Sequence, residues 1–94
     1  MQSQIILYCK ELIDKNNQKD LQQYIDQLIY NTDYEDIHPN WQYIFQKIYL
    51  HACLKKRSII VSWLENDIFK LFDSVSQIAL RQSFKYGHYL LNKK

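Results

Sequence analysis

Apolar residues recur at helical spacing along most of the chain, and the longest such series runs from Trp41 to Leu54. Spacings of three and four residues place one set of apolar side chains on a single helical face: Trp41, Ile44, Phe45, Ile48 and Ala52. A second set widens that face: Tyr43, Leu50, Cys53 and Leu54. A helix that is apolar over most of its circumference is a buried one. We therefore expect this helix to be the centre of the fold.

Two further periodic stretches precede it, over residues 3–15 and 18–30. The inner face of the first is predicted from its apolar positions: Ile5, Ile6, Cys9, Leu12 and Ile13. That of the second is predicted in the same way: Leu21, Tyr24, Ile25, Leu28 and Ile29. Asn16 can end the first helix in place of the usual glycine, and Asn17 can cap the second. Residues 3–30 are thus predicted to form a helical hairpin.

Residues 31–40 are predicted to be an acidic linker, with Pro39 as the first residue of the following helix. The basic turn Lys55-Lys56-Arg57 ends that helix, where cations meet the negative pole of the helix dipole. Ser58 is predicted to cap the next helix, which stays apolar through Leu64. The pattern therefore predicts a second antiparallel hairpin over 41–64.

The C-terminal helices are predicted over residues 67–92. Asn66-Asp67 is expected to break or bend the chain before a short apolar helical turn at 68–72. Asp73-Ser74 and Gln77 have the spacing of a capping box, which marks the start of a longer helix.

That last helix is predicted to end at Gly87, the expected C′ position. Its inward-facing residues are predicted to be Val75, Ile78, Ala79 and Phe84. One glycine and one proline in the whole chain are too few for the turns of a β-rich fold. The sequence thus predicts an all-α fold with more than roughly 60% helix, arranged as a small bundle or stack of five to six helices in antiparallel hairpins.

Length and composition place this fold in a single intracellular domain. The chain has 94 residues, which suits one small domain. Its two cysteines, Cys9 and Cys53, lie in apolar helical contexts and are expected to be reduced and buried. No apolar run is long enough to span a membrane and no cleavable leader is apparent, so a cytoplasmic or nuclear location is expected. The abundance of Lys, Ile, Asn, Gln and Tyr is typical of an AT-rich genome, such as that of a protist or a large DNA virus.

A faint internal repeat is visible, in which Leu50-x-x-Cys53-Leu54-x-x-Arg57-Ser58 aligns with Leu80-x-x-Ser83-Phe84-x-x-Gly87-His88. Over about residues 48–92 the chain resembles ankyrin-like helical-hairpin repeats, through its Leu50-His51 and Gly87-His88 pairs. No Thr-Pro precedes Leu50-His51, and Arg57 stands where a glycine is expected. The resemblance implies a protein-binding surface and no catalysis. A generic stack of helical hairpins is the alternative.

No catalytic or metal site is predicted. The candidate ligands are His38, His51, His88, Cys9 and Cys53. His51 and Cys53 are two positions apart, which places them on different sides of a helix. No nucleophile and base have a suggestive spacing, and a single glycine leaves no phosphate-binding loop. We expect no enzyme activity, no cofactor and no small-molecule substrate.

The charges divide unevenly along the chain. Residues 1–40 carry three lysines against seven acids, a net charge of −4, whereas residues 41–94 carry nine basic residues against three acids, a net charge of +6. We expect the heads of the basic turn to project together into solvent, on one edge with the turn at Gly87. The predicted binding residues on that edge are Lys55, Lys56, Arg57, Lys85 and His88. A protein partner is expected, with the chain as an accessory, adaptor or assembly subunit.

Nucleic-acid binding by the basic C-terminal half is the alternative function. Two arginines are few for reading bases or for bidentate phosphate recognition. A helix-turn-helix also fits poorly, because residues 67–72 are nearly all apolar where a polar recognition helix would be needed.

Overall fold

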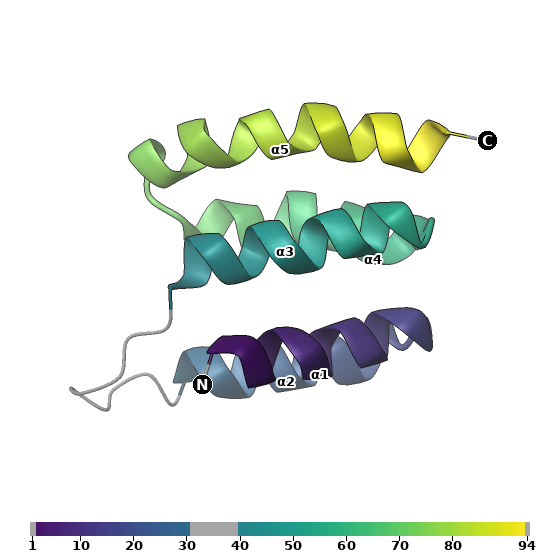
Figure 1. Cartoon of the computed structure of the whole chain (residues 1–94). Helices are drawn as coiled ribbons and strands as arrows, with labels where there is room; N and C mark the ends of the chain where they lie inside the picture. The colour runs from purple at the N-terminus through teal and green to yellow at the C-terminus, as the bar shows by residue number, and fades with distance from the viewer. Residues whose placement is uncertain (1, 31–39, 94) are drawn as a thin grey trace.

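Helical hairpins stack in layers in the computed structural model, which describes residues 2–30 and 40–93 (Figure 1). The helices are α1 (Gln2–Asp14), α2 (Gln18–Tyr30), α3 (Trp41–Leu54), α4 (Ser58–Trp63) and α5 (Ser74–Asn92), with a π-helical turn η1 (Leu64–Ile68) and a 3-10 turn η2 (Phe69–Leu71) between the last two. Of the described residues 88% are helical and none is in a strand, which confirms the all-α prediction. Residues 31–39 of the predicted linker 31–40 lie outside the described residues.

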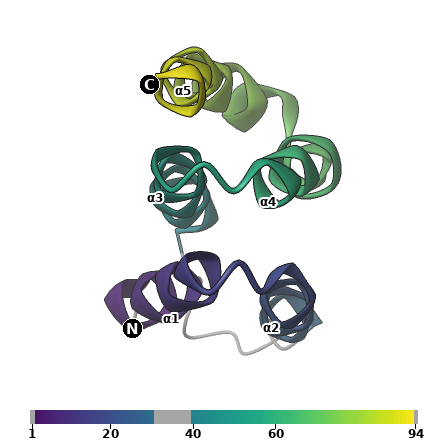
Figure 2. The ribbon, with the colours of Figure 1, turned by 90° about the vertical axis from the view of Figure 1, so that its right-hand side faces the viewer.

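The layers are the pair α1–α2, the pair α3–α4 and the single helix α5 (Figure 2). The helix α3 lies between α1 and α5 and contacts both, as well as α4. The helix α5 is the outer layer, and its packing within the described chain is against α3 and the η1–η2 segment. The predicted central role of residues 41–54 is confirmed.

The turns of the two hairpins have the same backbone geometry. Asn16 and Lys56 both adopt the left-handed conformation, with φ of 54° and 61°. The N–H of Asn17 donates to the carbonyl of Leu12 at 2.9 Å, and the N–H of Arg57 donates to that of Ala52 at the same distance. These are the bonds of a Schellman motif, which satisfies carbonyls that a helix end leaves unpaired. Asn16 therefore ends α1 as the sequence predicts.

The residues that cap the starts of α2, α3 and α4 agree only in part with the prediction. Asn17 caps α2 as expected, since its Oδ1 accepts the N–H of Asp20 at 3.2 Å. Asn40 caps α3, so that helix begins at Trp41 rather than Pro39. The helix α4 begins at Ser58 itself, with Arg57 at the N-cap position and no side-chain cap. The predicted serine cap was wrong, because the carbonyl of Arg57 already accepts the first helical hydrogen bond, from the N–H of Val61 at 2.9 Å, so Ser58 lies inside the helix.

The helix α5 begins at the predicted Asp73-Ser74 pair, but without the predicted capping box. Asp73 is the N-cap, and its Oδ1 accepts the N–H of Ser76 at 2.8 Å. The carboxylate is thereby stabilised, and this hydrogen bond lowers the pKa of Asp73. Gln77 forms no capping box, because its Nε2 donates to the carbonyls of Phe69 and Phe72, at 3.3 and 3.0 Å. The side chain of Gln77 thus fixes α5 to the preceding segment.

The predicted break at Asn66-Asp67 is a change of helix type rather than an end. The chain passes from α4 into the π turn η1 and then the 3-10 turn η2, as expected for a short helical segment at 68–72. Leu64 and Ile68 stay buried across this change. The apolar side chains of η1 therefore stay in the core through the change of helix type, before α5 begins.

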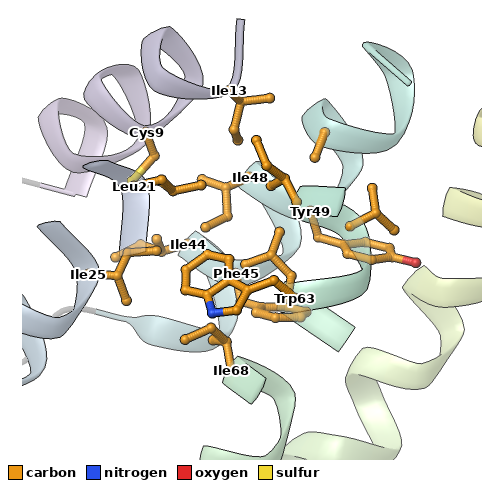
Figure 3. Close-up of a cluster of buried hydrophobic side chains, with 14 of the residues drawn as sticks. Cys9, Ile13, Leu21, Ile25, Ile44, Phe45, Ile48, Tyr49, Trp63 and Ile68 are labelled. Atoms are coloured by element: carbon orange, nitrogen blue, oxygen red, sulfur yellow. The ribbon is translucent and has the colours of Figure 1, made fainter. Parts of the chain in front are cut away.

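The core confirms the prediction made for the second hairpin (Figure 3). Apolar side chains of both helices are buried: Ile44, Ile48, Ala52, Val61 and Leu64. The second predicted set of α3 is buried only in part, since Tyr43 and Leu54 are 43% and 58% exposed. Aromatic rings extend this core towards α5, because Tyr49 stacks on Phe45 at 5.7 Å between ring centroids and lies 5.0 Å from Phe84. The predicted inward position of Phe84 is confirmed, since its ring packs against the core.

The rest of the predicted inner face of α5 was wrong. Val75 and Ile78 are 79% and 64% exposed and Ala79 is exposed. The helix instead buries Leu80, Ser83 and Gly87. A Cβ on Gly87 would lie 2.5 Å from Cε2 of Tyr49 and 2.9 Å from Sγ of Cys53, so a glycine is what permits this close approach.

Gly87 therefore lies inside α5 and does not end it. The predicted turn at Gly87-His88 is absent from the described chain, and the helix continues to Asn92. Since its φ is not positive, Gly87 is needed here for space rather than for an unusual backbone conformation.

Candidate interaction surface

The basic turn between α3 and α4 binds the ends of the two neighbouring helices. Arg57 donates from Nε to the carbonyl of Ile13 at 3.1 Å and from Nη2 to that of Asp14 at 2.6 Å, at the C-terminal end of α1. Lys56 donates from Nζ to the carbonyls of Leu90 and Leu91 at 2.6 and 3.2 Å, near the end of α5. Both cations thus meet carbonyls of a last helical turn, at the negative pole of a helix dipole.

These contacts differ from the expected projection of three basic heads into solvent. The side chains of Lys56 and Arg57 reach to opposite neighbours of α3, although Lys56, like Lys55, is exposed. Lys85 and His88 lie within α5, and both are exposed. The predicted basic edge is therefore not a single turn-based surface, and its role in partner binding stays a prediction.

Arg57→Ala is expected to lower the free energy of unfolding by about 1–3 kcal/mol, because two charge-assisted hydrogen bonds to the end of α1 are lost. The measurement is urea denaturation followed by far-UV circular dichroism. Lys55→Ala is the matched control, since Lys55 belongs to the same turn and is exposed. Equal effects of the two changes would contradict a structural role for Arg57.

A carboxylate on η1 joins α3 to the C-terminal half of α5. Glu65 Oε2 accepts the hydroxyl of Tyr49 at 2.7 Å and lies 2.8 Å from Nε2 of His88. Burial of Tyr49, aided by the hydrogen bond to Glu65, raises the pKa of its hydroxyl, which therefore stays a donor. This cluster ties α3, η1 and α5 together, so it explains His88 as a structural contact.

A second polar pair links α3 to α1. His51 Nε2 lies 2.7 Å from Oδ1 of Asp14, and this hydrogen bond lowers the pKa of Asp14. Within residues 2–30 and 40–93 no three side chains of His, Cys, Asp or Glu gather in a geometry that could hold a metal ion. His38, one of the candidate ligands, lies outside these ranges.

Both cysteines are buried, as predicted. Burial raises the pKa of Cys9 to about 12 and that of Cys53 to about 11, which disfavours the reactive thiolate. We expect both to react slowly with a thiol reagent in the native protein at about pH 8, and fast after denaturation. Quantitative labelling followed by mass spectrometry measures this. Rapid native-state modification of either residue would contradict its burial.

An exposed apolar stripe runs along the outer face of α5. It consists of Val75, Ile78, Tyr86 and Tyr89, which are 79%, 64%, 53% and 58% exposed. Their spacings of three, eight and three residues place them on one helical face, with Gln82 completing the row. The rings of Tyr86 and Tyr89 stack with their centroids 6.3 Å apart. We call these five residues the α5 stripe.

The sequence pattern does not reveal the α5 stripe, because it predicts Val75 and Ile78 on the buried face of the helix. The helix has two apolar faces, and only one can lie on α3. Two basic side chains border the stripe, since Arg81 and Lys85 are exposed and one helical turn apart. The guanidinium of Arg81 also lies 6.0 Å from the ring centroid of Phe69.

A separate apolar groove of about 350 Å³ lies between α2, α3 and the η1–η2 segment. Its lining is Ile25, Ile29, Trp41, Ile44, Phe45, Ile48, Ile68, Leu71 and Phe72. Aliphatic and aromatic walls of this kind can hold an apolar group, but they offer few polar atoms to orient a reactant.

No described helix has the length and apolar character needed to cross a lipid bilayer. Comparisons with protein-family models, with curated proteins and with solved structures found no match.

Proposed function

We propose that this chain is a non-enzymatic protein–protein interaction module, an intracellular accessory or adaptor subunit that binds its partner through the α5 stripe. The observation that carries the proposal is the second apolar face of α5, which remains open to solvent while the first is buried on α3. Exposed apolar residues that form a continuous row typically mark a binding surface.

The composition of the α5 stripe supports a protein partner. Tyrosine is enriched in protein interfaces, because its ring supplies apolar area and its hydroxyl can still form a hydrogen bond. Val75 and Ile78 each gain about 1.5–3 kcal/mol when an exposed side chain of this size becomes fully buried. A partner that covers the stripe would therefore bind with a favourable free energy from the burial of these apolar side chains.

The nucleic-acid alternative has less support from the side chains. Of the two arginines, Arg57 is held at the end of α1 by two hydrogen bonds, while Arg81 is exposed beside the ring of Phe69. Bidentate recognition of phosphates or bases depends mainly on arginine. The basic half of the sequence is thus used in part to hold the fold together.

Affinity capture from cells that naturally make the protein tests the proposal. The wild-type chain is expected to retain a protein partner after nuclease treatment, and Ile78→Glu is expected to lose it. Ile59→Glu is the matched control, because Ile59 is 71% exposed on α4 and lies outside the α5 stripe. Loss of every partner after nuclease would favour the nucleic-acid alternative.

A further inference from the structure

We propose that the partner segment bound by the α5 stripe is an amphipathic helix with acidic flanks, supplied by another protein. This inference rests on the proposed function and adds the chemistry of the partner. It follows from the shape of the stripe and from the charges beside it.

The α5 stripe is straight and narrow, which suits a helix. Its ends, Val75 and Tyr89, lie fourteen residues apart in a continuous helix, which corresponds to roughly 21 Å at 1.5 Å per residue. Side chains spaced three and four residues apart form a ridge that fits the groove of a second helix. A partner helix of roughly four turns could therefore cover the whole stripe.

The centre of the stripe adds one polar position. Gln82 is exposed between Ile78 and Tyr86, and its amide can both donate and accept a hydrogen bond. A polar residue at the middle of a partner seam would pair with it and fix the register of the two helices. Apolar residues on either side would cover the aliphatic end and the tyrosine end of the stripe.

The basic residues of α5 favour a partner helix with acidic residues beside its apolar face. Arg81 and Lys85 border the stripe one turn apart, and the helix contains no acidic residue from Ser74 to Asn92. The contact of Arg81 with Phe69 limits the directions that its guanidinium can take. Glutamate or aspartate along the facing edge of a partner helix would meet both cations, and charge complementarity of this kind raises the association rate and rejects basic partners.

A second copy of this chain is a poorer occupant. If α5 of one copy lay on α5 of another, Arg81 and Lys85 would meet the same basic row, with no acidic residue in either helix. Like charges at an interface are costly. A symmetric pairing of two α5 helices is therefore disfavoured, and an acidic helix of another chain is the better match.

Titration with synthetic helical peptides tests the inference on the intact protein. One peptide of roughly fifteen residues has a leucine seam with a central glutamine and glutamate flanks; a matched peptide has lysine in place of every glutamate. We expect the acidic peptide to bind at least about tenfold more tightly by fluorescence anisotropy, with an association rate that falls as salt increases. Ile78→Glu should abolish this binding.

Charge-reversal variants complete the test. Arg81→Glu combined with Lys85→Glu should abolish the preference for the acidic peptide or reverse it. Lys15→Glu combined with Lys19→Glu is the matched control, since both lysines are exposed in the α1–α2 hairpin, and should leave the preference unchanged. Circular dichroism of each variant verifies that the helix content is retained.

Four results would overturn the inference. Equal binding of both peptides, or an unchanged preference in the charge-reversed variant, would show that the basic border does not select the partner. If neither peptide binds but capture of a partner still depends on Ile78, the partner is not an acidic helix. The proposed function would then stand. Sedimentation that shows a dimer, disrupted by Ile78→Glu, would make a second copy the occupant.

Discussion

Ile48→Ala is expected to lower the free energy of unfolding by about 2–5 kcal/mol, the range found for large truncations in a core. Ile48 is only 2% exposed and lies in the middle of α3. Neighbours on several sides surround it, because α3 contacts α1, α4 and α5. A truncation there leaves a cavity that these helices cannot close without losing other contacts.

Such a loss would be a large part of the stability of a small domain, which is typically about 5–15 kcal/mol. Urea denaturation followed by circular dichroism measures the change. Ile59→Ala is the matched control, since the same side chain is 71% exposed on α4, and it should change the stability by less than about 0.5 kcal/mol. A similarly small effect of Ile48→Ala would show that α3 is not the centre of the core.

Gly87→Ala is expected to destabilise the protein by up to about 2 kcal/mol, because the steric cost of the new methyl group exceeds the gain in helix propensity. Alanine in the interior of a helix is favoured over glycine by about 1 kcal/mol. The new Cβ, however, would lie 2.5 Å from Cε2 of Tyr49 and 2.9 Å from Sγ of Cys53. Overpacking of a core typically costs about 1–3 kcal/mol, and both neighbours here are themselves fully buried.

Because both neighbours are buried and cannot move away, the steric cost of a Cβ at Gly87 should exceed the gain in helix propensity. A larger side chain at this position should raise the steric cost further. Gly87→Val is therefore expected to cost more than Gly87→Ala in the same thermal or urea denaturation. Gln82→Ala is the control for helix propensity, since Gln82 is exposed in the same helix, and it should have an effect within about 0.5 kcal/mol. Stabilisation by Gly87→Ala would mean that α5 and α3 do not approach as closely as described.

Most of the fold could be predicted because its signals are local. The turn at Asn16 depends on residues that are adjacent in sequence, and Asn17 caps a helix only three residues away. The burial of α3 follows in the same way from the spacing of its own apolar residues. Local propensity, capping and periodicity all agree over residues 2–30 and 41–54, so the sequence alone determined these hairpin elements and the position of the core.

The surface of α5 could not be predicted, because the helix presents two apolar faces and its own sequence does not rank them. Which face of α5 is buried depends on Tyr49 and Cys53 of α3, because these side chains leave room only for a glycine, Gly87, at the closest point of α5. The basic turn poses the same problem, since the carbonyl that Arg57 binds belongs to Ile13, far away in sequence. Only the tertiary structure decided these features, because the free energy of close packing and of long-range hydrogen bonds depends on which helices meet.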